Sequence, residues 1–83
     1  MKDATRSSLA EALRLLFLAE ALPKEIERVR NEILPVWEEL PPESRAVGVL
    51  LIKNDLKYAE DMTAEHDTVG MLYAHKRLVG WRL

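Results

Sequence analysis

The chain has 83 residues, and its twelve basic and fourteen acidic side chains give a formal net charge of −2 at pH 7. Apolar residue types make up 48% of the chain and charged types 31%, which excludes an intrinsically disordered chain and favours one small folded domain. The charge balance lacks the basic excess typical of nucleic-acid binders, and the absence of cysteine excludes disulfides, zinc fingers and iron–sulfur clusters.

No apolar stretch near the N-terminus is continuous enough to predict a signal peptide or a membrane span. The stretch that follows the basic start is interrupted by Glu11, Arg14 and Glu20. We therefore expect a cytoplasmic protein that makes no contact with a membrane.

The first predicted helix covers residues 4–22. Ala, Leu, Glu and Arg dominate it, and Asp3 or Thr5 can cap its N-terminus. Residues 15–19 are apolar on nearly every side, which is typical of a helix that is central in its domain or covered by another chain. We expect the helix to end at Leu22, because the residue before a proline disfavours the helical conformation.

A second helix is predicted over residues 23–40. Pro23 suits its first turn, and apolar residues recur along it at steps of three and four residues. This apolar seam consists of Ile26, Val29, Ile33, Val36 and Leu40. Pro35 lies inside the pattern and crowds the carbonyl group four residues back, so we expect a kink or a break at residues 31–34.

Pro41 and Pro42 predict a firm boundary before a third helix over residues 43–65. Residues 46–52 would also suit a short buried strand, because β-branched residues and a glycine occur there. The polar run that follows has a helical composition and contains no turn signal. Continuity therefore favours a helix through the whole segment.

The last predicted helix covers residues 68–79. Asp67 or Thr68 can start it, since both residue types are favourable helix N-caps. Gly80 can cap its C-terminus, which leaves residues 80–83 as a tail.

These segments predict a single domain over residues 1–83 that is all-α, a small bundle of about four helices with the second kinked or broken at Pro35. The alternative is an α+β fold with the short strand at residues 46–52. The sequence contains no phosphate-binding loop, dinucleotide-binding fingerprint, nucleophile elbow or zinc-protease motif. We therefore expect no catalytic residues, no metal site, no cofactor and no enzymatic activity.

One cluster of titratable residues leaves an enzymatic alternative open. Asp61 and Glu65 are four residues apart on one predicted helix face, His66 adjoins them, and His75 lies on the next helix. Carboxylates and imidazoles can bind a divalent metal or exchange protons, but the Glu-x-x-His pairs of helical-bundle metal sites are missing. A solvated acidic face is the simpler interpretation, and a small metal-dependent or acid–base enzyme is an alternative function.

The end of the chain separates its charges. Residues 55–67 contain five acids and one lysine, a net charge of −4, whereas residues 68–83 contain three basic residues and no acid. The basic residues are Lys76, Arg77 and Arg82. Basic residues interleaved with Tyr73 and Trp81 can hold phosphates and stack bases, so a nucleic-acid-binding regulator is a second alternative. Three basic residues beside an acidic run are few for that role, which disfavours it.

The leading interpretation is a protein–protein interaction or regulatory module that binds another protein, within a homodimer or a larger assembly. Four short helices have limited means to cover both the apolar residues 15–19 and the seam of the second helix. The C-terminal tail either folds back on the bundle or anchors in the groove of a partner, since Trp and Arg are enriched at binding hot spots. The predicted partner-binding residues are Leu15, Leu16, Leu18, His75, Arg77, Trp81 and Arg82.

Overall fold

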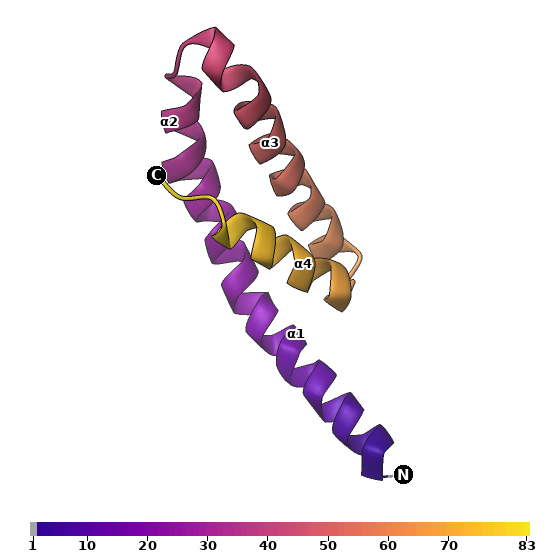
Figure 1. Cartoon of the computed structure of the whole chain (residues 1–83). Coiled ribbons are helices and arrows are strands. Elements are labelled where there is room, and N and C mark those ends of the chain that lie inside the picture. Colours follow the sequence, from indigo (N-terminus) through magenta and orange to yellow (C-terminus); the bar gives the residue numbers. More distant parts are fainter. Residues whose placement is uncertain (1) are drawn as a thin grey trace.

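The computed structural model describes the backbone of residues 2–83 and the side chains of residues 9–83, and every regular element in this part of the chain is helical. The elements in chain order are α1 (Lys2–Arg28), a π-helical turn η1 (Val29–Ile33), α2 (Leu34–Glu38), α3 (Pro42–Ala64) and α4 (Thr68–Val79). The first three form one continuous rod, α3 runs back along its upper half, and α4 packs against both (Figure 1).

The prediction of an all-α fold is confirmed, but the prediction of a bundle of about four helices is wrong. The first two predicted helices are one rod, so the chain has three helical bodies among its described residues. The alternative strand at residues 46–52 is not formed, because these residues lie inside α3.

The predicted helix boundary at Leu22 is wrong because α1 continues through Pro23. A proline inside a helix costs about 3 kcal/mol. This cost is opposed by the burial of Leu18, Leu22 and Val29, which are completely buried and lie on one face of the rod. Burying a leucine or a valine contributes about 1.5–3 kcal/mol, so keeping this face continuous outweighs the cost of the proline.

The irregularity predicted near Pro35 is present as the π-helical turn η1. The N–H group of Leu34 donates to the carbonyl oxygen of Val29, five residues back, instead of to the residue four back. The wider turn lies where the proline ring would otherwise crowd the carbonyl of Asn31. The rod therefore passes this proline with a change of helix type and no break.

The turn between α3 and α4 is a Schellman motif. The N–H group of Asp67 donates to the carbonyl of Met62 at 3.1 Å, and that of His66 donates to the carbonyl of Thr63 at 3.2 Å. His66 has φ of 53°, in the left-handed region. The carboxylate of Asp67 then accepts a hydrogen bond from the N–H group of Gly70 at 2.9 Å, which confirms Asp67 as the N-cap of α4.

The hydrophobic core lies where α1, η1, α3 and α4 meet, in the upper part of the molecule. Its buried residues are Leu18, Leu22, Val29, Ile33, Ile52, Leu56, Ala59, Met71, Ala74 and Leu78. The N-terminal half of α1 projects beyond this core (Figure 1). The molecule measures 57 × 18 × 16 Å, and its radius of gyration is 15.4 Å against about 12 Å for a compact chain of this length.

Over the part of the chain that the structure describes, no helix combines the length and the apolar character that crossing a bilayer requires.

Candidate functional site

The projecting half of α1 carries a row of exposed apolar side chains. Leu9, Leu13, Leu16 and Phe17 have exposed fractions of 61%, 59%, 66% and 59%. We call these four residues the α1 stripe. Leu9, Leu13 and Leu16 follow each other at steps of four and three residues, the spacing that places side chains on one line along a helix.

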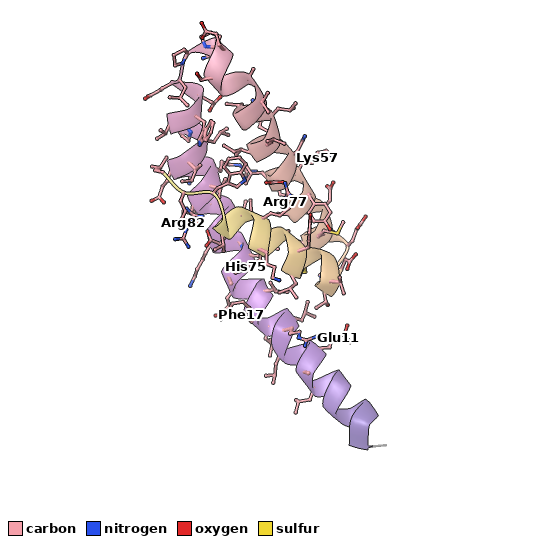
Figure 2. The ribbon with its side chains drawn as sticks, viewed as in Figure 1. Glu11, Phe17, Lys57, His75, Arg77 and Arg82 are labelled. Atoms are coloured by element: carbon pink, nitrogen blue, oxygen red, sulfur yellow. The ribbon has the colours of Figure 1, made fainter. Side chains whose placement is uncertain are left out.

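The α1 stripe lies on the face of the helix that points away from the core. Leu18 is two residues beyond Leu16, which is about 200° around the helix axis, and it is completely buried. Figure 2 shows Phe17 and Glu11 pointing away from α1 in different directions. All four side chains of the α1 stripe are apolar, so this face lacks the long polar side chains that a helix usually presents to solvent.

The positions that flank the α1 stripe are small. Ala10, Ala12 and Ala19 are exposed and lie on either side of the leucine line. In coiled coils, the flanking positions usually carry charged residues, which form salt bridges between the paired helices. Alanines at these positions instead allow another helix to approach closely.

A groove with mostly apolar walls borders the α1 stripe on the side of the α3–α4 turn. Its volume is about 560 Å³, with Leu15, Leu16 and Pro23 on one side and Thr63, His66 and Met71 on the other. Leu16 belongs both to this groove and to the α1 stripe. The apolar surface of α1 is therefore wider than one line of leucines.

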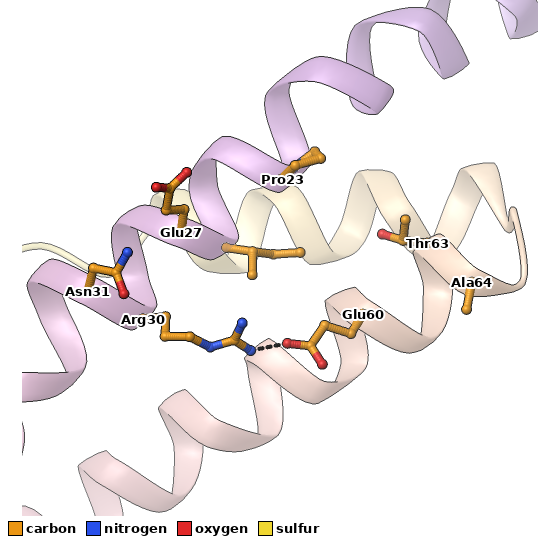
Figure 3. Close-up of a pocket in the computed structure, with 8 residues that line it drawn as sticks. Pro23, Glu27, Arg30, Asn31, Glu60, Thr63 and Ala64 are labelled. Carbon is orange, nitrogen blue, oxygen red and sulfur yellow. Dashed lines mark hydrogen bonds and ion pairs between the residues drawn. The ribbon is translucent and has the colours of Figure 1, made fainter.

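A second hollow lies between α1, η1 and α3 and has a volume of about 630 Å³ (Figure 3). Arg30 and Glu60 form an ion pair across it, and their side chains are about half exposed. Exposed ion pairs of this kind contribute little to stability. These two charges satisfy each other, and we assign no function to this hollow.

The C-terminal tail folds back on the chain at Asp55, the one buried charged residue among those whose side chains are described. One carboxylate oxygen of Asp55 accepts a hydrogen bond from Nε of Arg77 at 2.8 Å. The other accepts one from Nε1 of Trp81, also at 2.8 Å. This Asp55 cluster ties α3, α4 and the tail together.

The pKa of the Arg77 guanidinium is raised, first by its hydrogen bond to Asp55 and then by its hydrogen bond to the hydroxyl of Tyr73. Arg77 also lies over the ring of Tyr73, with 5.7 Å between Cζ and the ring centroid. The cationic form of Arg77 is therefore favoured in the folded chain, where it is directed at groups of the same chain.

Two further contacts hold Trp81. Its indole meets that of Trp37 edge to face, with 5.8 Å between ring centroids. The guanidinium of Arg28 donates to the carbonyl oxygens of Leu78 and Trp81 at 2.9 and 3.0 Å, which satisfies the free carbonyl end of α4. The tail is thus fixed by aromatic packing and by hydrogen bonds.

The predicted partner-binding residues fall into different environments. On α1, Leu16 is exposed, Leu15 is half-buried and Leu18 is in the core. Because residues 15–19 face both the core and the solvent, only part of this segment is accessible to a partner.

At the other end of the chain, Arg77 and Trp81 are held at Asp55, and Arg82 is exposed. His75 is half-buried and meets the ring of Phe17 edge to face, at 5.7 Å between centroids. The structure therefore brings His75 next to the α1 stripe and does not bring Arg77 or Trp81 there.

Leu9, Leu13 and Phe17 are the members of the α1 stripe that were not predicted as partner-binding. The signal that identifies them is the spacing of Leu9, Leu13, Leu16 and Glu20, at steps of four, three and four residues. This line is offset by two residues from the line of Leu18 and Leu22, so the two lines occupy opposite faces.

The residues proposed for a metal or acid–base site do not form a metal-binding group. Among the described side chains, no three histidine, aspartate or glutamate residues are placed to hold one ion. Asp61 instead pairs with Lys57 at 3.2 Å on the surface of α3.

Comparisons with known proteins found no family model, no curated protein and no solved structure that matches the chain. Its function is therefore inferred from the geometry of its own surfaces.

Proposed function

We propose that the chain is a protein–protein interaction module that works as a self-associating subunit, with α1 of one copy paired to α1 of a second copy. The observation that carries the proposal is the α1 stripe: four large apolar side chains on one projecting helix, each more than half exposed. Contiguous apolar surface of this kind is uncommon on monomeric proteins and is typical of interaction sites.

The surface area of the chain supports this proposal. The solvent-accessible surface is 6056 Å², whereas a compact monomer of 9.5 kDa exposes about 5,000 Å². The excess of about 1,000 Å² is close to the roughly 800 Å² that each partner buries in a typical stable interface. One interface along α1 would therefore bring the exposed surface near that of a compact protein.

The charge of the chain also permits two copies to associate. A net charge of −2 gives only weak repulsion between copies. A self-complementary interface needs one patch that fits its own copy, and a line of leucines flanked by alanines meets that need. A second copy is thus the partner that the charge and the α1 stripe favour together.

Sedimentation equilibrium on the wild-type chain and on two single variants tests the proposal. Leu13→Glu places a charge at the centre of the α1 stripe, and Leu50→Glu is the matched control, since Leu50 is 58% exposed on α3. We expect the wild-type chain and Leu50→Glu to form dimers. Leu13→Glu should weaken the dimer by at least about 100-fold, because two buried leucines are lost from each interface.

Circular dichroism provides the folding control, since both substitutions are at exposed positions and should leave the helix content unchanged. A wild-type chain that sediments as a 9.5 kDa monomer at every concentration would overturn the proposal. A dimer that survives Leu13→Glu would overturn the proposal as well. Loss of the dimer in Leu50→Glu would also contradict it, because the interface would then lie on α3.

A further inference from the structure

We infer that the two α1 helices pair in antiparallel orientation, with their crossing point at Leu13. This inference rests on the proposed self-association and adds the orientation and the register of the pair. It places the hairpin ends of the two chains at opposite ends of one elongated dimer.

This register places every member of the α1 stripe level with an apolar residue of the other copy. In an antiparallel pair centred on Leu13, Leu9 of each copy is level with Phe17 of the other copy. Leu16 is then level with Ala10, so a large side chain meets a small one. Interlocking of large and small side chains is how helix surfaces fill the space between them.

The charge at the end of the leucine line favours the antiparallel orientation. Glu20 continues the spacing of Leu13 and Leu16 on the same face. In a parallel pair Glu20 would be level with Glu20 of the second copy, and like charges at such positions are destabilising. In the antiparallel pair it is level with residue 6, an arginine in the sequence.

The position of the core is compatible with this pairing. The core lies against the face of α1 that carries Leu18 and Leu22, opposite Leu9, Leu13 and Leu16, and α4 meets the α1 stripe where His75 contacts Phe17. Each copy can therefore lay its α1 stripe on that of the other while α3 and α4 stay on the outside. The projecting half of one α1 then runs beside the apolar groove at the α3–α4 turn of the other.

The absence of cysteine from the chain makes a disulfide test of the orientation direct. Two single variants, Leu9→Cys and Phe17→Cys, are mixed, oxidised and analysed by mass spectrometry, which separates the three disulfide-linked products by mass. We expect the mixed 9–17 disulfide to dominate over both of the disulfides between identical chains. In the antiparallel pair two residues at position 9 are about 12 Å apart along the axis, beyond the reach of a disulfide.

Leu13→Cys is the positive control, because residue 13 is level with itself in either orientation. If 9–9 and 17–17 disulfides form without the mixed product, the helices are parallel and the inference fails while the proposed self-association stands. If none of the three variants forms a disulfide and the wild-type chain sediments as a monomer, both the inference and the proposed function fail.

Discussion

Asp55 is the residue that holds the C-terminal end of the chain against α3. It is 7% exposed, and each of its two carboxylate oxygens accepts one side-chain hydrogen bond, from Arg77 and from Trp81. A buried carboxylate is tolerated when charged or polar donors satisfy it, and here both donors come from the C-terminal end of the chain. Asp55 therefore fixes the tail as well as the packing of α4 on α3.

We expect Asp55→Ala to lower the free energy of unfolding by about 2–3 kcal/mol, since two hydrogen bonds to a charged group are lost and the indole N–H is left without its acceptor. Urea denaturation followed by circular dichroism measures the change. The matched control is Asp61→Ala, whose side chain is 53% exposed in an ion pair with Lys57 and whose loss should change stability by less than about 0.5 kcal/mol. Equal effects of the two substitutions would contradict this role of Asp55.

The pH dependence of this contact follows from the raised pKa of Arg77, whose first cause is the hydrogen bond to Asp55. A cation whose pKa is higher in the folded state stabilises that state at every pH below its ordinary pKa. The stabilisation is lost only as the pH rises through the folded-state pKa, far above neutrality. Titration of Arg77 therefore does not release the tail near neutral pH.

The Asp55 cluster was only partly predictable from sequence. Folding back was one of the two predictions for the tail, and the opposite net charges of residues 55–67 and 68–83 are compatible with the ion pair between Asp55 and Arg77. The partner of Trp81 was not predictable, because it lies 26 residues away and depends on how α4 crosses α3. Gly48 contributes to the same packing, because a side chain there would overlap the ring of Trp37, against which Trp81 packs.

At the scale of the elements, the α3–α4 turn has an unusual residue in a common motif. The left-handed position of a Schellman motif is usually glycine, because a side chain there costs about 1–2 kcal/mol, and here it is His66. His66 is exposed, so its side chain gains little from burial in compensation.

We expect His66→Gly to raise the free energy of unfolding by about 0.5–1 kcal/mol. Glycine relieves the backbone strain, and part of this gain is offset because glycine makes the unfolded chain more flexible. Thermal unfolding followed by circular dichroism measures it. His66→Ala is the matched control, because it removes the imidazole and keeps the Cβ atom that causes the strain. A His66→Gly variant no more stable than His66→Ala would show that the backbone conformation is not the cause.

The two prolines of the rod show what sequence patterns predict about elements and what they do not. Pro35 was expected to disturb its helix, and the π-helical turn η1 is that disturbance. Pro23 was expected to end a helix, yet α1 continues through it. Local preference was the same at both sites, so the sequence did not predict how the chain passes each proline; past Pro23 the helix stays regular and keeps Leu22 and Val29 both buried.

At the scale of the whole molecule, the unusual property is its length relative to its core. The rod of α1, η1 and α2 sets the 57 Å long axis, and α3 and α4 cover only its upper part. The sequence indicated this shortage of cover, because four short helices could not bury both apolar segments. The sequence did not show which apolar residues stay uncovered. Residues 15–19 belong partly to the core and partly to the α1 stripe, and the position of α4 decides which residue belongs to which.

The pairing of two such rods predicts a particular shape. Residues 2–13 occupy about 17 Å of the rod, which leaves about 40 Å of the 57 Å between Leu13 and the hairpin end. Two chains paired antiparallel at Leu13 therefore form a dimer about 80 Å long. A parallel pair in register would keep a length close to that of one chain.

Small-angle X-ray scattering of the wild-type chain tests the central claim most directly, because one curve gives both the mass and the longest dimension. The antiparallel dimer predicts twice the 9.5 kDa mass of the chain and a longest dimension of about 80 Å. A particle of 9.5 kDa with a length near 57 Å, at the highest concentration that stays in solution, would contradict it.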